Sequence, residues 1–125
     1  MKRILTDISG AAAIEFAVAA PIMAIMIFGV LQVGIYGVAN AGIKQGVDEA
    51  ARIATLYPRP TDTVIQAALL KKTFGLNSGS ASVSITHGTQ NGGAYVDINA
   101  QYVVPSVGFG FPTLSLSESR RAFQN

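Results

Sequence analysis

The longest run without a charged side chain constrains this chain more than any other feature. Residues 16–43 form 28 consecutive positions without Asp, Glu, Lys or Arg, in a chain of 125 residues. About 20 predominantly apolar residues are enough for a helix to cross the hydrocarbon core of a bilayer. A core helix of that length and purity is improbable in a small soluble protein. The run therefore predicts a membrane-spanning helix, with a span at about residues 14–43.

Composition narrows the function classes. Charged residues make up 13% of the chain, about half of the usual share, and there is no Cys, no Trp and one His. Disulfide frameworks, zinc ribbons, iron–sulfur sites and thiol catalysis are thereby excluded. The net charge is only +2 and the basic residues form no patch, so we expect no nucleic-acid partner.

The flanks of the span predict its orientation. Lys2 and Arg3 precede it, whereas Lys44 and Arg52 follow it in the company of acidic residues. The positive-inside rule then places the N-terminus in the cytoplasm and the C-terminal part outside. A cleaved secretory signal peptide is a poorer explanation, because the apolar run is too long and Glu15 interrupts its start.

Glu15 is the one charge at the head of the apolar run. A carboxylate at the centre of a membrane helix costs about 2.5–3.5 kcal/mol on insertion scales, and less near the end of the helix. One interpretation is that Glu15 reaches the headgroups. The other gives it a cation: proteolysis after Gly10 would place an ammonium group on Ala11, four residues before Glu15 and on the same helix face. That pair can also form between neighbouring subunits.

These residues carry a resemblance to a known family. The segment GAAAIEF, from Gly10 to Phe16, resembles the cleavage motif of type IV pilin-like proteins, in which Gly, four residues, Glu and an aromatic residue head a long apolar helix. The chain also resembles a narrower group, the TadE-like family of the tight-adherence (Tad/Flp) type IVb pilus system. This resemblance rests on Pro21, on the Phe-Gly pair at residues 28–29, on Gly34 and on the stretch DEAAR at residues 48–52. The resemblance extends to about Ala54.

The resemblance implies processing and assembly. A prepilin peptidase would cut between Gly10 and Ala11, removing residues 1–10 as a cytoplasmic leader, and Glu15 and Phe16 would act in assembly. The implied partners are that peptidase, the major Flp pilin, other pseudopilins, the inner-membrane Tad platform proteins with their ATPase, and the lipid bilayer. The implied role is a pseudopilin or minor pilin that supports a pilus used for surface adherence. Major pilins of this system usually carry Tyr at the position of Phe16 and are much shorter, which favours a minor component.

The resemblance also implies a location. The chain would sit in the bacterial inner membrane with a periplasmic C-terminal domain, and could pass into the extracellular pilus after assembly.

Small residues and one proline mark the long helix. Pro21 removes a hydrogen bond and predicts a kink. Gly42 and Gly46 are four residues apart, a spacing that suits close packing against another helix. Gly29 and Gly34 are further positions without a side chain, where another helix can approach closely. The alternative is that glycine is simply common in membrane helices.

The remaining pattern predicts an α+β fold. We expect a helix over residues 11–57 that carries an Asp48–Arg52 pair, a proline break at 58–60 and a small domain over 61–125. A second helix should begin at a capping Thr61, run to about Phe74 and stop at Gly75.

Period-two alternation predicts a small antiparallel meander. The strands are expected around Ala81–Thr86, Val96–Tyr102 and a short Leu114–Ser117, with a turn at 88–93 and a connection at 105–112. In that connection, Phe109 and Phe111 either tuck under the sheet or dock another subunit. Arg120 and Arg121 are expected to be solvated.

The sequence gives little support to an enzymatic function. His87 is the only imidazole, and we expect it to lack a carboxylate partner and a nucleophile. No phosphate-binding loop, dinucleotide motif or metal-ligand cluster is present in the sequence. We therefore expect no catalytic residue, no cofactor, no metal and no small-molecule substrate. The alternative to a pilin-like subunit is an unprocessed, single-pass anchored binding domain, and Gly10 and Glu15 discriminate between the two.

Overall fold

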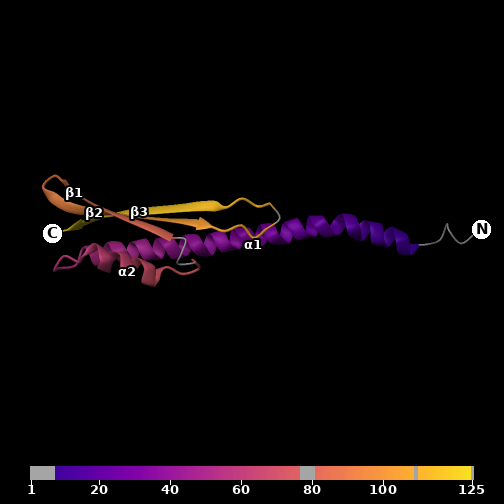
Figure 1. Ribbon diagram of the computed structural model, residues 1–125, viewed down its shortest axis with the longest axis horizontal. Helices are drawn as coiled ribbons and strands as arrows, with labels where there is room; N and C mark the ends of the chain where they lie inside the picture. Colours follow the sequence, from indigo (N-terminus) through magenta and orange to yellow (C-terminus); the bar gives the residue numbers. More distant parts are fainter. Residues whose placement is uncertain (1–7, 77–80, 109, 125) are drawn as a thin grey trace, which may run out of the picture.

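The computed structural model describes residues 8–76, 81–108 and 110–124. The described part contains two helices, α1 (Ile8–Ala54) and α2 (Asp62–Lys72), followed by three strands, β1 (Ala81–Gln90), β2 (Gly93–Val104) and β3 (Leu114–Gln124). This is the predicted α+β class, with one long helix, one short helix and an antiparallel sheet (Figure 1). Lys2, Arg3 and Phe109 lie outside the described residues.

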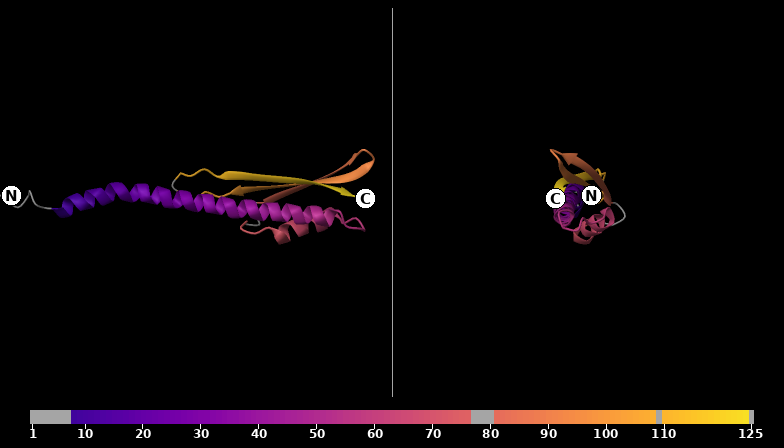
Figure 2. Two further views of the ribbon diagram at one scale, coloured as in Figure 1. Left: turned by 180° about the vertical axis from the view of Figure 1, so that it is seen from behind. Right: turned by 90° about the vertical axis from the view of Figure 1, so that its left-hand side faces the viewer.

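Helix α1 has 47 residues, which corresponds to about 70 Å at 1.5 Å per residue. It begins at Ile8 rather than at residue 11, and continues through Pro21 without interruption. Both side views show its N-terminal part curving away from the axis of the rest (Figures 1 and 2).

The C-terminal end of α1 comes earlier than expected. The helix ends at Ala54 rather than near residue 57, because Thr55 and Leu56 donate backbone hydrogen bonds to the carbonyl groups three residues before them. Such i→i+3 bonds tighten and close a last turn. Gln124 of β3 donates a side-chain hydrogen bond of 3.2 Å to the carbonyl of Ala54, which ties the end of the chain to the end of α1.

The two halves of α1 have different surroundings. Residues 10–31, called the free half here, project from the rest of the molecule except near Gly29, which the Phe111 ring approaches (Figures 1 and 2). Residues 32–54, the covered half, lie between the sheet and α2 (Figures 1 and 2). The covered half, α2 and the sheet together form the outer domain. Its buried hydrophobic core consists of Ala39, Ile43, Val47, Ala50, Ala54, Ile65, Leu69, Val96, Ile98, Ala100, Tyr102, Val104, Leu116 and Ala122. The α1 members recur every three or four residues, so one face of the helix completes the domain.

The sheet is the predicted meander in the order β1-β2-β3, with both pairs antiparallel. The turn between β1 and β2 is only Asn91–Gly92, both with positive φ (52° and 81°), as two-residue hairpins require. Strand β1 therefore extends to Gln90, through part of the expected turn. Strand β3 is also much longer than expected, because it pairs with β2 from Leu114 to Gln124.

Helix α2 agrees with its prediction only in part. Ile65 and Leu69 are buried as expected, but Val64 and Phe74 remain about half exposed. The Thr61 side chain makes no capping hydrogen bond and contacts the Thr63 hydroxyl instead. The helix stops at Lys72, short of Gly75. Gly75 still takes a left-handed conformation, with φ +67°.

Candidate functional site

The free half of α1 is the main candidate site, because its apolar side chains point outward on all sides. Exposed fractions of 50–73% are found for Ile14, Phe16, Val18, Ile22, Met23, Ile25, Met26, Ile27, Val30 and Leu31. A helix that is apolar all round needs a membrane or other helices as its surroundings. By length and composition, α1 is also the one helix in the described part of the chain that is able to cross a membrane.

Gln32 marks the point at which the outer domain starts to cover α1. Its side chain is only 5% exposed. Its amide nitrogen donates a hydrogen bond of 3.3 Å to the Pro105 carbonyl, and its amide oxygen accepts one of 3.0 Å from the Val107 backbone N–H. One helical turn earlier, Gly29 faces the Phe111 ring, since a Cβ built on Gly29 would lie 3.7 Å from that ring.

This boundary shortens the stretch available for a bilayer. Residues 10–31 make about 33 Å of helix, which matches a hydrocarbon core of about 30 Å. Ala39 and Ile43, inside the span expected at 14–43, are fully buried in the outer domain. The sequence could not separate these two environments, because both are apolar. Val33 and Val38 stay exposed on the other side of the covered half.

The residues of the processing motif lie at the start of the free half. Gly10 and Ala11 are inside the helical segment, and a Cβ added to Gly10 would meet no atom within 4 Å. Glu15 is exposed, and four residues separate it from Ala11, so the two share a helix face. None of the basic side chains in the described ranges forms an ion pair with Glu15.

The glycines expected to pack against helices have three different surroundings. A Cβ on Gly42 would lie 2.0 Å from the Phe74 carbonyl oxygen, and one on Gly46 would lie 2.5 Å from the Thr73 methyl group. These two glycines therefore let the end of α2 approach α1 within the same chain. Gly29 faces the Phe111 ring, and Gly34 has open space around it.

The prediction of an ion pair between Asp48 and Arg52 in the covered half was wrong. Arg52 instead donates two hydrogen bonds of 2.8–2.9 Å to Glu49. They lower the pKa of Glu49 and raise that of Arg52. Asp48 accepts a hydrogen bond of 2.8 Å from Arg120, because the unexpected length of β3 brings that guanidinium over α1.

Arg120 and Arg121 are both exposed to solvent, as expected, but Arg121 also has partners that the sequence did not indicate. Its guanidinium donates to both carboxylate oxygens of Asp97 at 2.7 and 2.8 Å and lies 4.0 Å from the centre of the Tyr95 ring. The hydrogen bonds from Arg121 lower the pKa of Asp97, and the same contacts raise that of Arg121.

His87 has the carboxylate partner that it was expected to lack. Its Nε2 lies 2.7 Å from an Asp62 carboxylate oxygen, because β1 passes beside the start of α2. Both side chains are about half exposed. The contact links the sheet to α2 across the outer domain.

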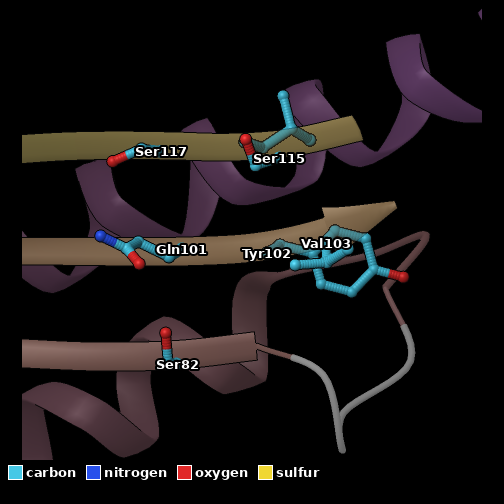
Figure 3. Close-up of a pocket in the computed structure, with 7 residues that line it drawn as sticks. Ser82, Gln101, Tyr102, Val103, Ser115 and Ser117 are labelled. Carbon is cyan, nitrogen blue, oxygen red and sulfur yellow. The ribbon is translucent and has the colours of Figure 1, made fainter. Parts of the chain in front are cut away.

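The outer face of the sheet carries a row of polar side chains, although Val103 and Phe123 are also exposed on it. Ser82, Gln101 and Ser117 form a row across the three strands, and Figure 3 shows them around a hollow of about 230 Å³. The row holds hydroxyl and amide groups without a titratable side chain. It is the wet face that the alternating pattern predicts.

Sequence reasoning missed the contact between Gln32 and the 105–112 connection. A signal was present, because Gln32 is one of the few strongly polar side chains in the uncharged run. A polar group in such a helix needs a hydrogen-bonding partner, but the sequence does not show where that partner lies.

Together, the free half of α1, the Gly10 and Glu15 motif at its head and the small outer domain suggest membrane anchoring of the kind found in pilin-like proteins. Residues 10–52, which cover most of α1 and neither α2 nor the sheet, match the family model described as TadE-like protein. The match supports a TadE-like protein of the Tad pilus system. No curated protein and no solved structure gives a significant match to the chain.

Proposed function

We propose that the chain is a pseudopilin, or minor pilin, of a Tad pilus, made as a precursor and assembled through the free half of α1. The observation that carries this proposal is a largely exposed apolar stretch of 22 residues that is headed by Gly10 and Glu15 and lies within the segment that matches the TadE-like family. The partners we propose are a prepilin peptidase, the major Flp pilin, other pseudopilins and the inner-membrane Tad platform. The proposed role is structural and not catalytic.

The first step is cleavage between Gly10 and Ala11. A peptidase has to reach this bond in an unwound chain, and glycine costs a helix about 1 kcal/mol relative to alanine. Gly10 has open space around it and lies two residues inside the first turn of α1. Local unwinding at this point therefore disrupts no packing.

The second step is assembly guided by Glu15. Cleavage creates an ammonium group at Ala11, and the exposed Glu15 carboxylate lies in the apolar half of α1. An unpaired charge in hydrocarbon is costly, so pairing with the N-terminus of the same or a neighbouring subunit stabilises the assembled state. Phe16, which is 71% exposed, adds apolar surface beside that pair.

Cleavage is tested by coexpression of the full chain with an active prepilin peptidase. We expect a product ten residues shorter that begins at Ala11, and we expect Gly10→Val to block the cut. Gly34→Val is the matched control, because Gly34 also lies in α1 with nothing within 4 Å of an added Cβ. Full-length chain that persists while the peptidase cuts its own major pilin would support the alternative, an unprocessed anchored binding domain.

Assembly is tested separately with Glu15→Gln. The amide keeps the size of the side chain and removes its charge. We expect normal cleavage but a loss of the processed chain from cross-linked complexes with the other pilins. Unchanged cross-linking would remove Glu15 from the proposed assembly step.

A further inference from the structure

We propose that the connection between β2 and β3 rests in the headgroup region of the bilayer and seats the outer domain on the membrane surface. This connection, called the β2–β3 loop here, comprises residues 105–108 and 110–112. The partner is the phospholipid bilayer itself. The inference rests on the proposed function only in taking the free half of α1 as the membrane-spanning segment.

The first argument is the position of the loop. Figure 1 shows it as the part of the sheet that reaches farthest toward the N-terminal end of α1. Gln32 holds it there through Pro105 and Val107, and the Phe111 ring packs beside Gly29. These contacts place the loop where the 22-residue uncovered stretch ends, which is where the bilayer surface lies if that stretch spans the membrane.

The second argument is the absence of charge at this end of the domain. No charged residue occurs between Asp97 and Glu118, and none occurs on α1 between Glu15 and Lys44. The ion pair between Lys44 and Glu118, with 3.5 Å between their charged atoms, joins the two positions at which charge resumes. Phe111 is half-buried, so part of an aromatic ring remains open at the level that aromatic side chains favour in membrane proteins.

The third argument is the hydrogen bonding of the loop backbone. An unsatisfied N–H group is costly near hydrocarbon. Pro105 and Pro112 have no N–H. The Val107 N–H donates to Gln32, the Gly108 N–H to the Ser106 hydroxyl at 3.2 Å, and the Phe111 N–H to the Gly108 carbonyl at 3.2 Å. These three backbone donors are thus paired within the protein, which suits a depth at which water is scarce.

The experiment uses the absence of tryptophan from the chain. Phe111→Trp and Phe123→Trp are each made in the full chain and reconstituted into phosphatidylcholine vesicles, with or without bromine atoms close to the headgroups. Phe123 is the matched control, because it is a half-exposed Phe near the opposite end of the outer domain. We expect the bromines to quench the emission of the Phe111→Trp chain and to leave that of the Phe123→Trp chain unchanged. Val107→Trp provides a second probe on the same loop and should also be quenched.

Ile22→Trp, in the middle of the free half, separates failure of this inference from failure of the proposed function. Quenching of Ile22→Trp by deep bromines, with no quenching of either loop probe, would overturn the seating while leaving the membrane span intact. Loop probes with blue-shifted emission that lipid bromines do not quench would mean that another protein copy covers the loop, which also overturns it. If Ile22→Trp is not quenched either, the membrane span and the proposed function both fail.

Discussion

Replacing Gly42 by alanine tests how the outer domain is held to α1. The added Cβ would lie 2.0 Å from the Phe74 carbonyl oxygen and 3.0 Å from the Phe74 backbone nitrogen. Because these are backbone atoms, a change of side-chain rotamer cannot relieve the clash. The end of α2 must move away from α1, which loosens the packing of Leu69 against the core.

Two opposing effects set the magnitude. Overpacking of a close contact typically costs about 1–3 kcal/mol, whereas alanine is better than glycine inside a helix by about 1 kcal/mol. Gly37→Ala is the matched control, because it brings the same gain in helix propensity and its Cβ would meet nothing within 4 Å. The free energy of unfolding should therefore be about 1–3 kcal/mol lower for Gly42→Ala than for Gly37→Ala.

The assay is denaturant unfolding of the full chain in mild detergent, followed by tyrosine fluorescence, with hydrogen exchange in α2 as a second readout. The Gly42 variant should unfold at lower denaturant and exchange its α2 amides faster. Equal stability of the two variants, with unchanged exchange in α2, would refute the close approach of the two helices.

Three further changes test other parts of the outer domain. Ile43→Ala should lower its stability by about 2–5 kcal/mol in the same unfolding assay, as expected for a fully buried side chain, and wild-type stability would contradict the assignment of residue 43 to the core. Gln32→Met leaves the Val107 N–H without its partner, so it should cost about 1–3 kcal/mol and speed the exchange of that amide. Unchanged exchange at residue 107 would count against the contact. Arg121 lowers the pKa of Asp97 in the folded state, so this pair stabilises the fold above the unfolded pKa of about 3.9 and loses its effect as the pH falls through the lower folded value. When the free energy of unfolding is measured against pH, it should therefore fall less toward acid pH for Asp97→Asn than for the wild-type chain. Identical pH profiles of the two chains would exclude the pair as a contributor to stability.

The local elements could be predicted because their patterns are strong. The length of the run without charged residues indicated the long helix. The alternation of apolar and polar residues from Val96 to Tyr102 indicated the central strand. Strand β3 was underestimated because adjacent charges at Arg120 and Arg121 interrupt its alternation, although Ala122 and Gln124 continue the inward face.

The division of α1 could not be predicted from hydropathy. The helix remains apolar from the free half into the covered half, and only the fold shows that Ile43 faces protein. Partners distant in sequence were also hidden. Asp48 lies 72 residues from Arg120, and Gln32 lies 75 residues from Val107. Such contacts depend on how the sheet is placed on the helix, which no local pattern records.

The N-terminal residue of the chain in pilus-producing cells tests the proposed function most directly. Intact-mass measurement of the protein recovered from membranes and from sheared pili would identify it. We predict a chain that begins at Ala11 in cells with an active prepilin peptidase, and one that retains residues 1–10 when the peptidase is inactive. A chain that keeps its leader in both strains would contradict the assignment as a processed pseudopilin.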